Sequence, residues 1–196
     1  MASGAKGLAV LVLAAGKGTR MKSGRAKVLH EIAGRPLLGF PLAVAEALGP
    51  ARLVVVIGRD AELVRERFDG RARFVLQEEQ RGTGHAVLTA REALEGFDGD
   101  VFILYGDTPL LRESTLRRMI ALKAEKKADL VMLSALVPLP GRVVRDGSGR
   151  VARIVEAVDA TPEELAIPEG NTGVYLVGSE LLWKALSQVD DANAQG

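Results

Sequence analysis

Residues 8–21 read LAVLVLAAGKGTRM, an apolar run followed directly by a glycine-rich, basic loop. The run Leu8–Leu13 has no polar residue in alternation, which is typical of a strand buried on both faces, as in a parallel sheet. In open α/β folds, ligands bind where such strands end. This stretch therefore predicts the first strand of an α/β domain, with a ligand-binding loop at its carboxyl end.

Short apolar runs recur along the chain, and segments with helical spacing separate them. The runs predict further strands over residues 53–57, 74–76, 101–105 and 130–137. Helical periodicity, in several cases stopped by Gly or Pro, predicts helices over residues 37–48, 61–68, 83–94 and 114–126. Such alternation implies right-handed crossovers. We therefore expect a Rossmann-like, doubly wound, mostly parallel sheet with helices on both faces.

The pattern changes after Pro138. Segments 142–145 and 151–156 flank the turn residues Asp146–Gly149, which predicts a β-hairpin. A strand over 172–177 and a helix over 179–188 follow. We expect a small β-rich lobe attached to the α/β core, and a single domain over residues 1–196, because no repeat or low-complexity linker interrupts the chain.

The composition narrows the chemistry. The 196 residues carry 26 basic and 25 acidic side chains, and this near-neutral balance disfavours a nucleic-acid partner. There is no cysteine and there are two histidines. Disulfide scaffolds, thiolate metal sites and cysteine nucleophiles are therefore excluded, and the metals to consider are hard cations held by oxygen ligands.

The longest apolar run, residues 8–15, is far shorter than the roughly 20 residues of a membrane helix, so no membrane contact is expected. The same run behind Lys6 has features of a secretion signal. However, Lys17, Arg20 and Lys22 follow it closely, and the missing cysteines agree with a cytoplasmic location. We expect the cytoplasm.

The loop that follows the first strand has the chemistry of a phosphate site. Its glycines allow backbone N–H groups to approach phosphate oxygens, Arg20 can hold them in a bidentate fork, and Lys27 can add a point charge. The loop is not a Walker sequence, and Met21 stands where a dinucleotide fingerprint needs Gly or Ala. The alternatives are an ordinary flexible turn and a solvated surface lysine.

A second group of polar residues follows the run that ends at residue 76. The amide of Gln77 offers one acceptor and two donors, which matches the edge of uracil or thymine. Gly82 can present backbone groups to a base, and Thr83 can cap a helix or bond a ligand. Taken alone, Gln77 is more simply interpreted as a solvent-exposed glutamine at the end of a strand.

The third group is Tyr105-Gly106-Asp107, at the end of the most apolar strand. A carboxylate there can hold Mg²⁺ against triphosphate oxygens, and Gly106 leaves room for a ligand. The alternative is an aspartate that only starts a turn before Pro109. We interpret His30 and His85 as packing or capping residues.

Together these motifs resemble a known family. Residues 13–21 and 27–30, LAAGKGTRM and KVLH, resemble the sugar-1-phosphate nucleotidyltransferases. QRGTGHA at 80–86, YGD at 105–107, IVE at 154–156 and NTG at 171–173 follow in the order found in the bacterial N-acetylglucosamine-1-phosphate uridyltransferases. The resemblance runs from about residue 8 to the last residue.

The resemblance implies transfer of uridylyl from UTP to N-acetylglucosamine 1-phosphate, with in-line attack at the α-phosphorus. The products would be pyrophosphate and UDP-N-acetylglucosamine, a precursor of peptidoglycan and lipopolysaccharide. It implies that Arg20 and Lys27 are catalytic and that Asp107 holds the cofactor Mg²⁺. The implied nucleotide and sugar contacts are Leu13, Ala14, Ala15, Gly16, Lys27, Gln77, Gly82, Thr83, Tyr105, Gly106, Asp107, Gly141, Glu156 and Asn171. The last three of these would contact the sugar.

The chain also departs from the family pattern. Ala26 replaces a usual proline, which should loosen the backbone before Lys27. Leu139-Pro140 replaces Gly-Tyr before Gly141, which weakens the assignment of Gly141 to the sugar. Relatives continue past the matching region with an asparagine that is a second Mg²⁺ ligand. They also have a β-helix domain for acetyl transfer and trimer formation, so we expect this chain to be a truncated transferase domain.

Three alternatives remain. One is the same chemistry on another pair of substrates, such as dTTP and glucose 1-phosphate, because Gln77 does not separate uracil from thymine. Another is a nucleotide-binding fragment that is inactive through truncation. The third, a nicotinamide dehydrogenase, is disfavoured by Met21.

Overall fold

The computed structural model describes residues 7–16, 18 and 21–188. The described residues form two compact units. Unit 1 contains the residues up to Val131 and those from Tyr175 onward, and unit 2 contains Met132–Val174. The chain leaves unit 1 along β7 (Leu130–Ala135) and returns along β10 (Gly170–Gly178), so each of these strands contributes to both units.

Unit 1 is built on a twisted sheet whose four neighbouring strands run parallel in the order β5-β4-β1-β6. These strands are β1 (Gly7–Ala14), β4 (Arg52–Ile57), β5 (Arg73–Leu76) and β6 (Gly99–Tyr105). Residues 175–178 of β10 add an antiparallel strand beside β6. Residues 9–12 of β1 are completely buried, as the unbroken apolar run predicts.

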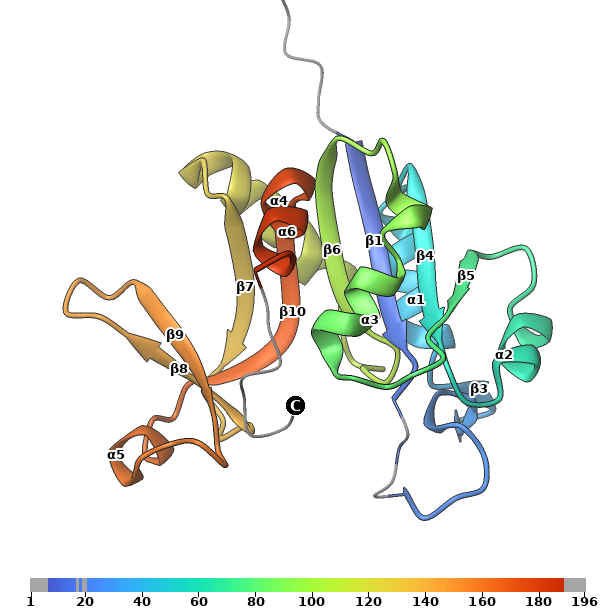
Figure 1. The fold of residues 1–196 in the computed structure, drawn as a ribbon, viewed down its shortest axis with the longest axis horizontal. Helices are drawn as coiled ribbons and strands as arrows, with labels where there is room; N and C mark the ends of the chain where they lie inside the picture. Colours follow the sequence, from blue (N-terminus) through green and yellow to red (C-terminus); the bar gives the residue numbers. More distant parts are fainter. Residues whose placement is uncertain (1–6, 17, 19–20, 189–196) are drawn as a thin grey trace, which may run out of the picture. The chain divides into compact units, whose positions relative to one another are not determined.

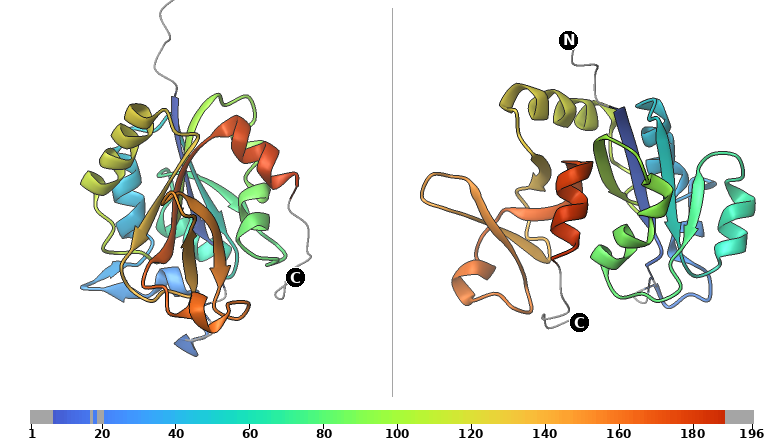
Figure 2. Two further views of the ribbon diagram at one scale, coloured as in Figure 1. Left: turned by 90° about the vertical axis from the view of Figure 1, so that its left-hand side faces the viewer. Right: turned by 45° about the horizontal axis from the view of Figure 1, so that its top comes forward.

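Helices cover both faces of this sheet (Figures 1 and 2). On one face α3 (Thr83–Thr89) and α6 (Ser179–Leu186) pack their apolar residues, among them Val87 and Leu182, against alternate residues of β1. On the other lie α1 (Gly39–Ala47) and α4 (Glu113–Lys126). The expected Rossmann-like, mostly parallel sheet is therefore confirmed.

The strand order places a reversal between β1 and β6. From β1 the chain moves outward through β4, α2 (Ala61–Arg67) and β5, and then returns by α3 to the opposite side of β1. Crossovers that diverge from two neighbouring strands leave a crevice beyond their carboxyl ends, where ligands bind in such folds. The crevice here lies beyond Ala14 and Tyr105.

Two local expectations are wrong in detail. The helix expected over 83–94 ends at Thr89, and a separate 3₁₀ turn, Glu92–Leu94, follows. The Thr89 hydroxyl donates to the His85 carbonyl oxygen at 2.8 Å, a side-chain bond that competes with regular helix. Strand β5 is the sheet edge, so Leu76 is 38% exposed and not buried on both faces.

Three short elements were not anticipated. The 3₁₀ turn Lys27–Leu29 leads into a small hairpin of β2 (Glu31–Ile32) and β3 (Arg35–Pro36). The hairpin turns through Ala33 and Gly34, both at positive φ. In unit 2, α5 (Pro162–Leu165) starts at a capping box in which Thr161 and Glu164 bond each other's backbone.

Unit 2 contains the expected hairpin. Strands β8 (Gly141–Arg145) and β9 (Val151–Glu156) pair antiparallel, and Arg142 of β8 also pairs with Gly170 of β10. The Glu169 carboxylate connects β8 with β7. It accepts two hydrogen bonds from the guanidinium of Arg145 on β8, at 2.6 and 2.7 Å, and a third from the hydroxyl of Ser134 on β7, at 2.6 Å. Arg145 and Ser134 lower the pKa of Glu169 to about 2.

This arrangement predicts how the stability of the chain depends on pH. Because the pKa of Glu169 is lower in the folded state, its stabilising effect is complete above about pH 4.5 and is lost as the pH falls towards 2. We expect Glu169→Gln to lower the free energy of unfolding by about 1–3 kcal/mol at pH 7. Urea titrations at pH 7 and pH 3 measure the free energy of unfolding of both proteins. The difference between the variant and the wild type should be smaller at pH 3 than at pH 7. An equal difference at both pH values would contradict the prediction.

Candidate active site

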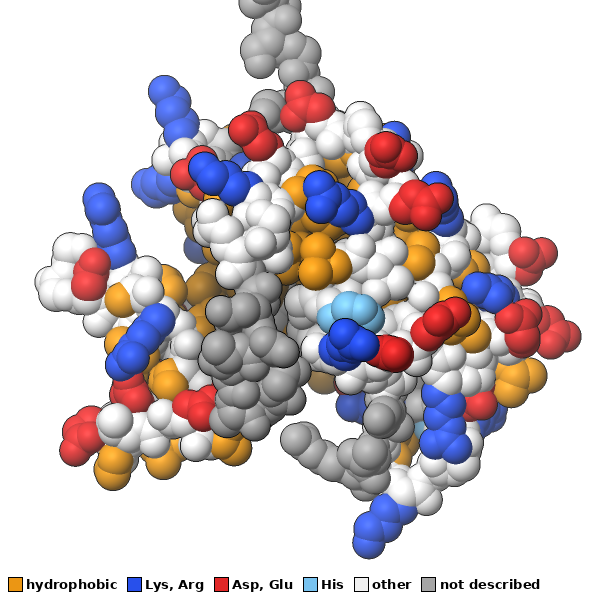
Figure 3. Space-filling view, in the orientation of Figure 1, with side chains coloured by type: hydrophobic (Ala, Val, Ile, Leu, Met, Phe, Trp, Pro, Cys, Tyr) orange, Lys and Arg blue, Asp and Glu red, His pale blue; other side chains and the backbone are white. Residues whose placement is uncertain are grey.

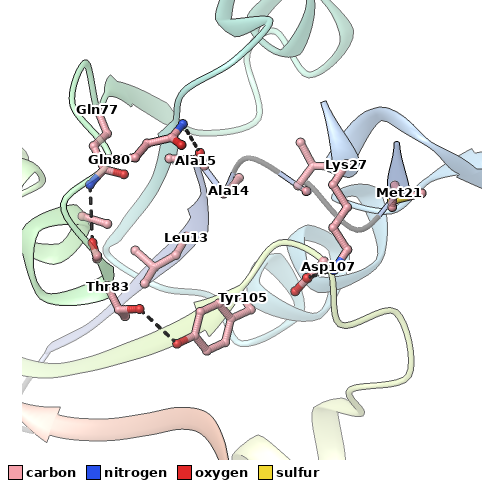
Figure 4. A pocket seen from close by; sticks show the side chains of 15 residues that line it. Leu13, Ala14, Ala15, Met21, Lys27, Gln77, Gln80, Thr83, Tyr105 and Asp107 are labelled. Atoms are coloured by element: carbon pink, nitrogen blue, oxygen red, sulfur yellow. Dashed lines mark hydrogen bonds and ion pairs between the residues drawn. The ribbon is translucent and has the colours of Figure 1, made fainter. Parts of the chain in front are cut away.

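A cavity of about 410 Å³ lies at the carboxyl ends of β1 and β6 in unit 1, within the usual size range of ligand sites. Figure 4 shows that its side chains come from the end of β1, the segment before α3 and the end of β6. The sequence-expected residues that line it are Leu13, Ala14, Ala15, Gly16, Lys27, Gln77, Gly82, Thr83, Tyr105 and Asp107.

The end of β1 is held in place from both neighbouring strands. Gly106 follows β6, and its N–H donates to the Leu13 carbonyl oxygen at 2.8 Å. A Cβ atom at Gly106 would lie 3.0 Å from Ala14 Cβ and 3.3 Å from the Leu13 carbonyl oxygen, so glycine relieves crowding where the two strand ends approach. Gly106 itself is not in the cavity wall; it brings β1 and Asp107 together.

On the other side, the Ala15 carbonyl oxygen accepts a 2.6 Å hydrogen bond from Gln80 Nε2. A Cβ atom at Gly58, just after β4, would lie 2.9 Å from this oxygen and 3.0 Å from Gln80 Nε2. The oxygen of the Gln80 amide, Oε1, is buried and has no partner among the described residues. Gln80 therefore fixes the loop backbone beside the cavity.

Lys27 and Asp107 form an ion pair across the cavity wall, with 2.5 Å between Nζ and Oδ2. Each side chain is about one-third exposed, at 38% and 32%, so both remain accessible to a ligand. The stem of Lys27 packs closely on the loop, because a Cβ atom at Gly18 would lie 2.8 Å from Lys27 Cβ. Gly18 has a φ of +59°, which also favours glycine.

Gln77 is 4% exposed, and its amide has a defined orientation. Its Nε2 lies 2.9 Å from His85 Nδ1 and 3.5 Å from the Gly82 carbonyl oxygen. Since a carbonyl oxygen only accepts, the nitrogen of the amide is the atom that faces it, and His85 then accepts through Nδ1. Oε1 of Gln77 accepts no hydrogen bond from a described residue and is left for a ligand.

The role of His85 differs from the packing or capping interpretation, because its ring orients Gln77. Other residues in the cavity wall that were not proposed as contacts are Gly18, Met21, Val28, Gln80 and Ala86. Tyr105, which was proposed, reaches Thr83 through a long contact of 3.5 Å between the two hydroxyl oxygens (Figure 4). Arg20 lies outside the described residues.

The three expected sugar contacts lie together in unit 2. Gly141 and Glu156 are directly paired between β8 and β9. A Cβ atom at Gly141 would lie 3.1 Å from Glu156 Oε1 and 3.3 Å from Asn171 Cβ, so glycine leaves both side chains in reach of each other. Gly141, Glu156 and Asn171 are thus close together, and their role in sugar binding stays a prediction.

Comparison with known proteins places the chain in a family. Residues 10–140 match the MobA-like NTP transferase domain. The chain belongs to this family. Among solved structures, one of UDP-glucose pyrophosphorylase complexed with UDP-glucose aligns with a TM-score of 0.74 over 95% of this chain and 80% of that one, at 22% identity. The chain therefore shares its fold with that enzyme.

Curated relatives are more similar in sequence. The bifunctional protein GlmU of Anaeromyxobacter dehalogenans strain 2CP-C is 51% identical over 196 aligned residues, 96% of this chain and 40% of the relative. GlmU of Trichlorobacter lovleyi is 51% identical over 192, covering 95% and 42%, and GlmU of Geobacter sulfurreducens is 48% identical over 194, covering 96% and 41%. The chain thus spans about two-fifths of the length of these relatives.

The close approach at Gly58 gives a testable prediction. Gly58→Ala places a methyl group against the Ala15 carbonyl oxygen and Gln80 Nε2, and we expect a loss of about 1–3 kcal/mol in the free energy of unfolding from overpacking. Gly24→Ala is the control, because its Cβ atom would meet nothing within 4 Å. Urea denaturation of the two variants measures the difference, and equal midpoints would contradict it.

Proposed function

We propose that this chain transfers a uridylyl group from UTP to N-acetylglucosamine 1-phosphate and releases pyrophosphate. The observation that carries the proposal is the cavity at the ends of β1 and β6, where a glycine-rich loop, the Lys27–Asp107 pair and the oriented Gln77 amide converge. Sequence identity of about 50% with GlmU proteins over nearly the whole chain supports it.

In this reaction the protein forms no covalent bond to either substrate. An oxygen of the sugar phosphate attacks the α-phosphorus of UTP in line, the new O–P bond forms, and the bond to the β-phosphate oxygen breaks. Catalysis then depends on alignment and on neutralising charge on the transferring group. The backbone amides near Ala14–Gly16 and the ammonium of Lys27 are the groups that we assign to the phosphates, with Arg20 assigned by family resemblance.

Mg²⁺ fits the residues of this site. No group of three or more metal-binding side chains occurs in the part of the chain that the structure describes, but Mg²⁺ is commonly held by one or two carboxylates together with substrate phosphates and water. Asp107 supplies an accessible carboxylate. We assign Asp107 as its protein ligand, where the ion would neutralise charge on the triphosphate.

The nucleobase is assigned to Gln77. With its nitrogen directed to His85 and Gly82, its free oxygen is an acceptor that suits the N3–H of uracil and opposes the N3 lone pair of cytosine. The grouped residues Gly141, Glu156 and Asn171 of unit 2 are assigned to the N-acetylglucosamine moiety.

Location and assembly stay proposals. None of the helices in the described part of the chain has the length and apolarity that crossing a bilayer takes. The absence of cysteine supports the cytoplasm, where the product would serve peptidoglycan and lipopolysaccharide synthesis. By family resemblance, trimers would form through the β-helix domain of the relatives, which lies outside the region that this chain matches.

A turnover assay tests the proposal. With UTP, N-acetylglucosamine 1-phosphate and Mg²⁺ we expect pyrophosphate and UDP-N-acetylglucosamine in equal amounts, and Asp107→Asn should lower kcat by about 100-fold or more. Asp100→Asn is the matched control: Asp100 lies at the other end of β6 and is paired with Lys123 at 3.0 Å. Its turnover should stay close to that of the wild type.

Other outcomes would contradict individual parts of the proposed function. Faster turnover with dTTP and glucose 1-phosphate would replace the proposed substrates. UTP binding measured by calorimetry, with turnover at background, would favour a nucleotide-binding protein. Wild-type turnover in Asp107→Asn would remove Asp107 from the site.

A second prediction concerns base selection. His85→Leu removes the acceptor that orients Gln77, so the amide can rotate and offer its nitrogen to the base. We expect the preference for UTP over CTP, measured as the ratio of kcat/KM values, to fall about tenfold, a modest fraction of what a polar recognition site can discriminate. His85→Asn keeps a side-chain acceptor and should retain more of the preference. An unchanged ratio in His85→Leu would contradict the role of His85.

A further inference from the structure

Asp60 has an unusual backbone conformation. Its φ and ψ are 56° and 33°, in the left-handed region that disfavours residues with a side chain, and it precedes α2. Aspartate at such a position usually stabilises the local turn or caps the helix, yet the Asp60 side chain makes no capping hydrogen bond to α2. The local helix therefore does not explain why this conformation carries a carboxylate.

The carboxylate acts on a distant segment. Asp60 Oδ2 accepts a 2.6 Å hydrogen bond from the backbone N–H of Ala26, 34 residues earlier in the chain. Ala26 is 2% exposed. Without Asp60, this buried N–H would have no partner, which is costly inside a protein.

Ala26 is the residue from which the Lys27–Leu29 turn starts. Its φ of −55° lies within the range of proline. The turn is closed by the N–H of Leu29 bonding the Ala26 carbonyl oxygen at 3.0 Å and by His30 bonding Lys27 at 3.1 Å. The loosening expected from alanine at position 26 is thus opposed by a hydrogen bond that proline lacks.

The next residue along is Lys27. Its stem packs on Gly18 and its ammonium bonds Asp107. Its position therefore depends on the loop after β1, on the end of β6 and, through Ala26, on the segment after β4. Of these three supports, only the one from Asp60 acts on the backbone before the lysine.

We propose that Asp60 is a positioning residue for Lys27: its carboxylate holds the Ala26 N–H and so fixes the turn that carries the lysine towards the phosphates of the nucleotide. The strained backbone of Asp60 is retained because the hydrogen bond needs a side-chain acceptor oxygen at that point. The functional part of this inference rests on the proposed function; the structural part does not.

The structural part is tested without any ligand, by amide hydrogen exchange in the full chain. Asp60→Gly removes the acceptor and relieves the backbone, and we expect the Leu29 and His30 amides to exchange at least about tenfold faster. Asp60→Asn keeps an acceptor and should stay near the wild type. The double variant Asp60→Gly with Ala26→Pro removes acceptor and donor together at a compatible φ, and should recover protection.

The control is Lys127→Gly, at another left-handed residue, with a φ of 49° at the end of α4. It should leave the exchange of Leu29 and His30 unchanged. Unchanged exchange in Asp60→Gly, or no recovery in the double variant, would overturn the inference.

Calorimetry with UTP and Mg²⁺ tests the link to Lys27. We expect Asp60→Gly to raise the Kd of UTP about fivefold to tenfold in the wild-type background, and to have no further effect in a Lys27→Ala background. A purely structural residue would weaken binding equally in both backgrounds, which would overturn the link. Absence of UTP binding by the wild type would instead reject the proposed function, and the exchange experiment would still decide on Asp60.

Discussion

The hydrogen bond from Gly106 N–H to the Leu13 carbonyl oxygen closes the β1–β6 pairing at the point where the chain reverses its direction across the sheet. The parallel register pairs Leu13 with Tyr105, so the residues after both strands emerge side by side. The glycine-rich loop and Asp107 are neighbours for this reason. The absence of a side chain at residue 106 relieves crowding against Ala14 at the end of this pairing.

The same constraint explains which site residues the sequence predicts. The loop after β1, the amide after β5 and the carboxylate after β6 each follow an apolar run directly, and parallel strands bring their carboxyl ends to one edge. Local sequence therefore locates Leu13–Gly16, Gln77 and Asp107 in one cavity. The central strands are predicted equally well, because burial on both faces leaves an unbroken apolar run.

What the sequence did not predict depends on long-range or conformational features. Asp60 acts on Ala26 through a bond that spans 34 residues, and its left-handed backbone has no sequence signal when the residue is not glycine. The β2–β3 hairpin was missed for a similar reason, since Ala33 occupies a positive φ. Helix α5 is different: Thr161-Pro162 with Glu164 is a capping box that the sequence displays, but the helix that it starts is only four residues long.

The charges at the cavity determine what kind of ligand it suits. Over the whole sequence, basic and acidic residues nearly cancel, and the face seen in Figure 3 mixes both signs. Among the described residues of the cavity wall, Lys27 and Asp107 are the ionisable groups of opposite sign, and each neutralises the other.

An anion that binds alone would form an ion pair with Lys27, but it would leave the Asp107 carboxylate close to a second negative charge. A polyphosphate that arrives with a divalent cation supplies a partner for each member of the pair, because the anion replaces Asp107 at the lysine and the cation replaces Lys27 at the carboxylate. The self-compensated pair therefore supports the proposal that the ligand is a metal-bound nucleotide and not a free anion.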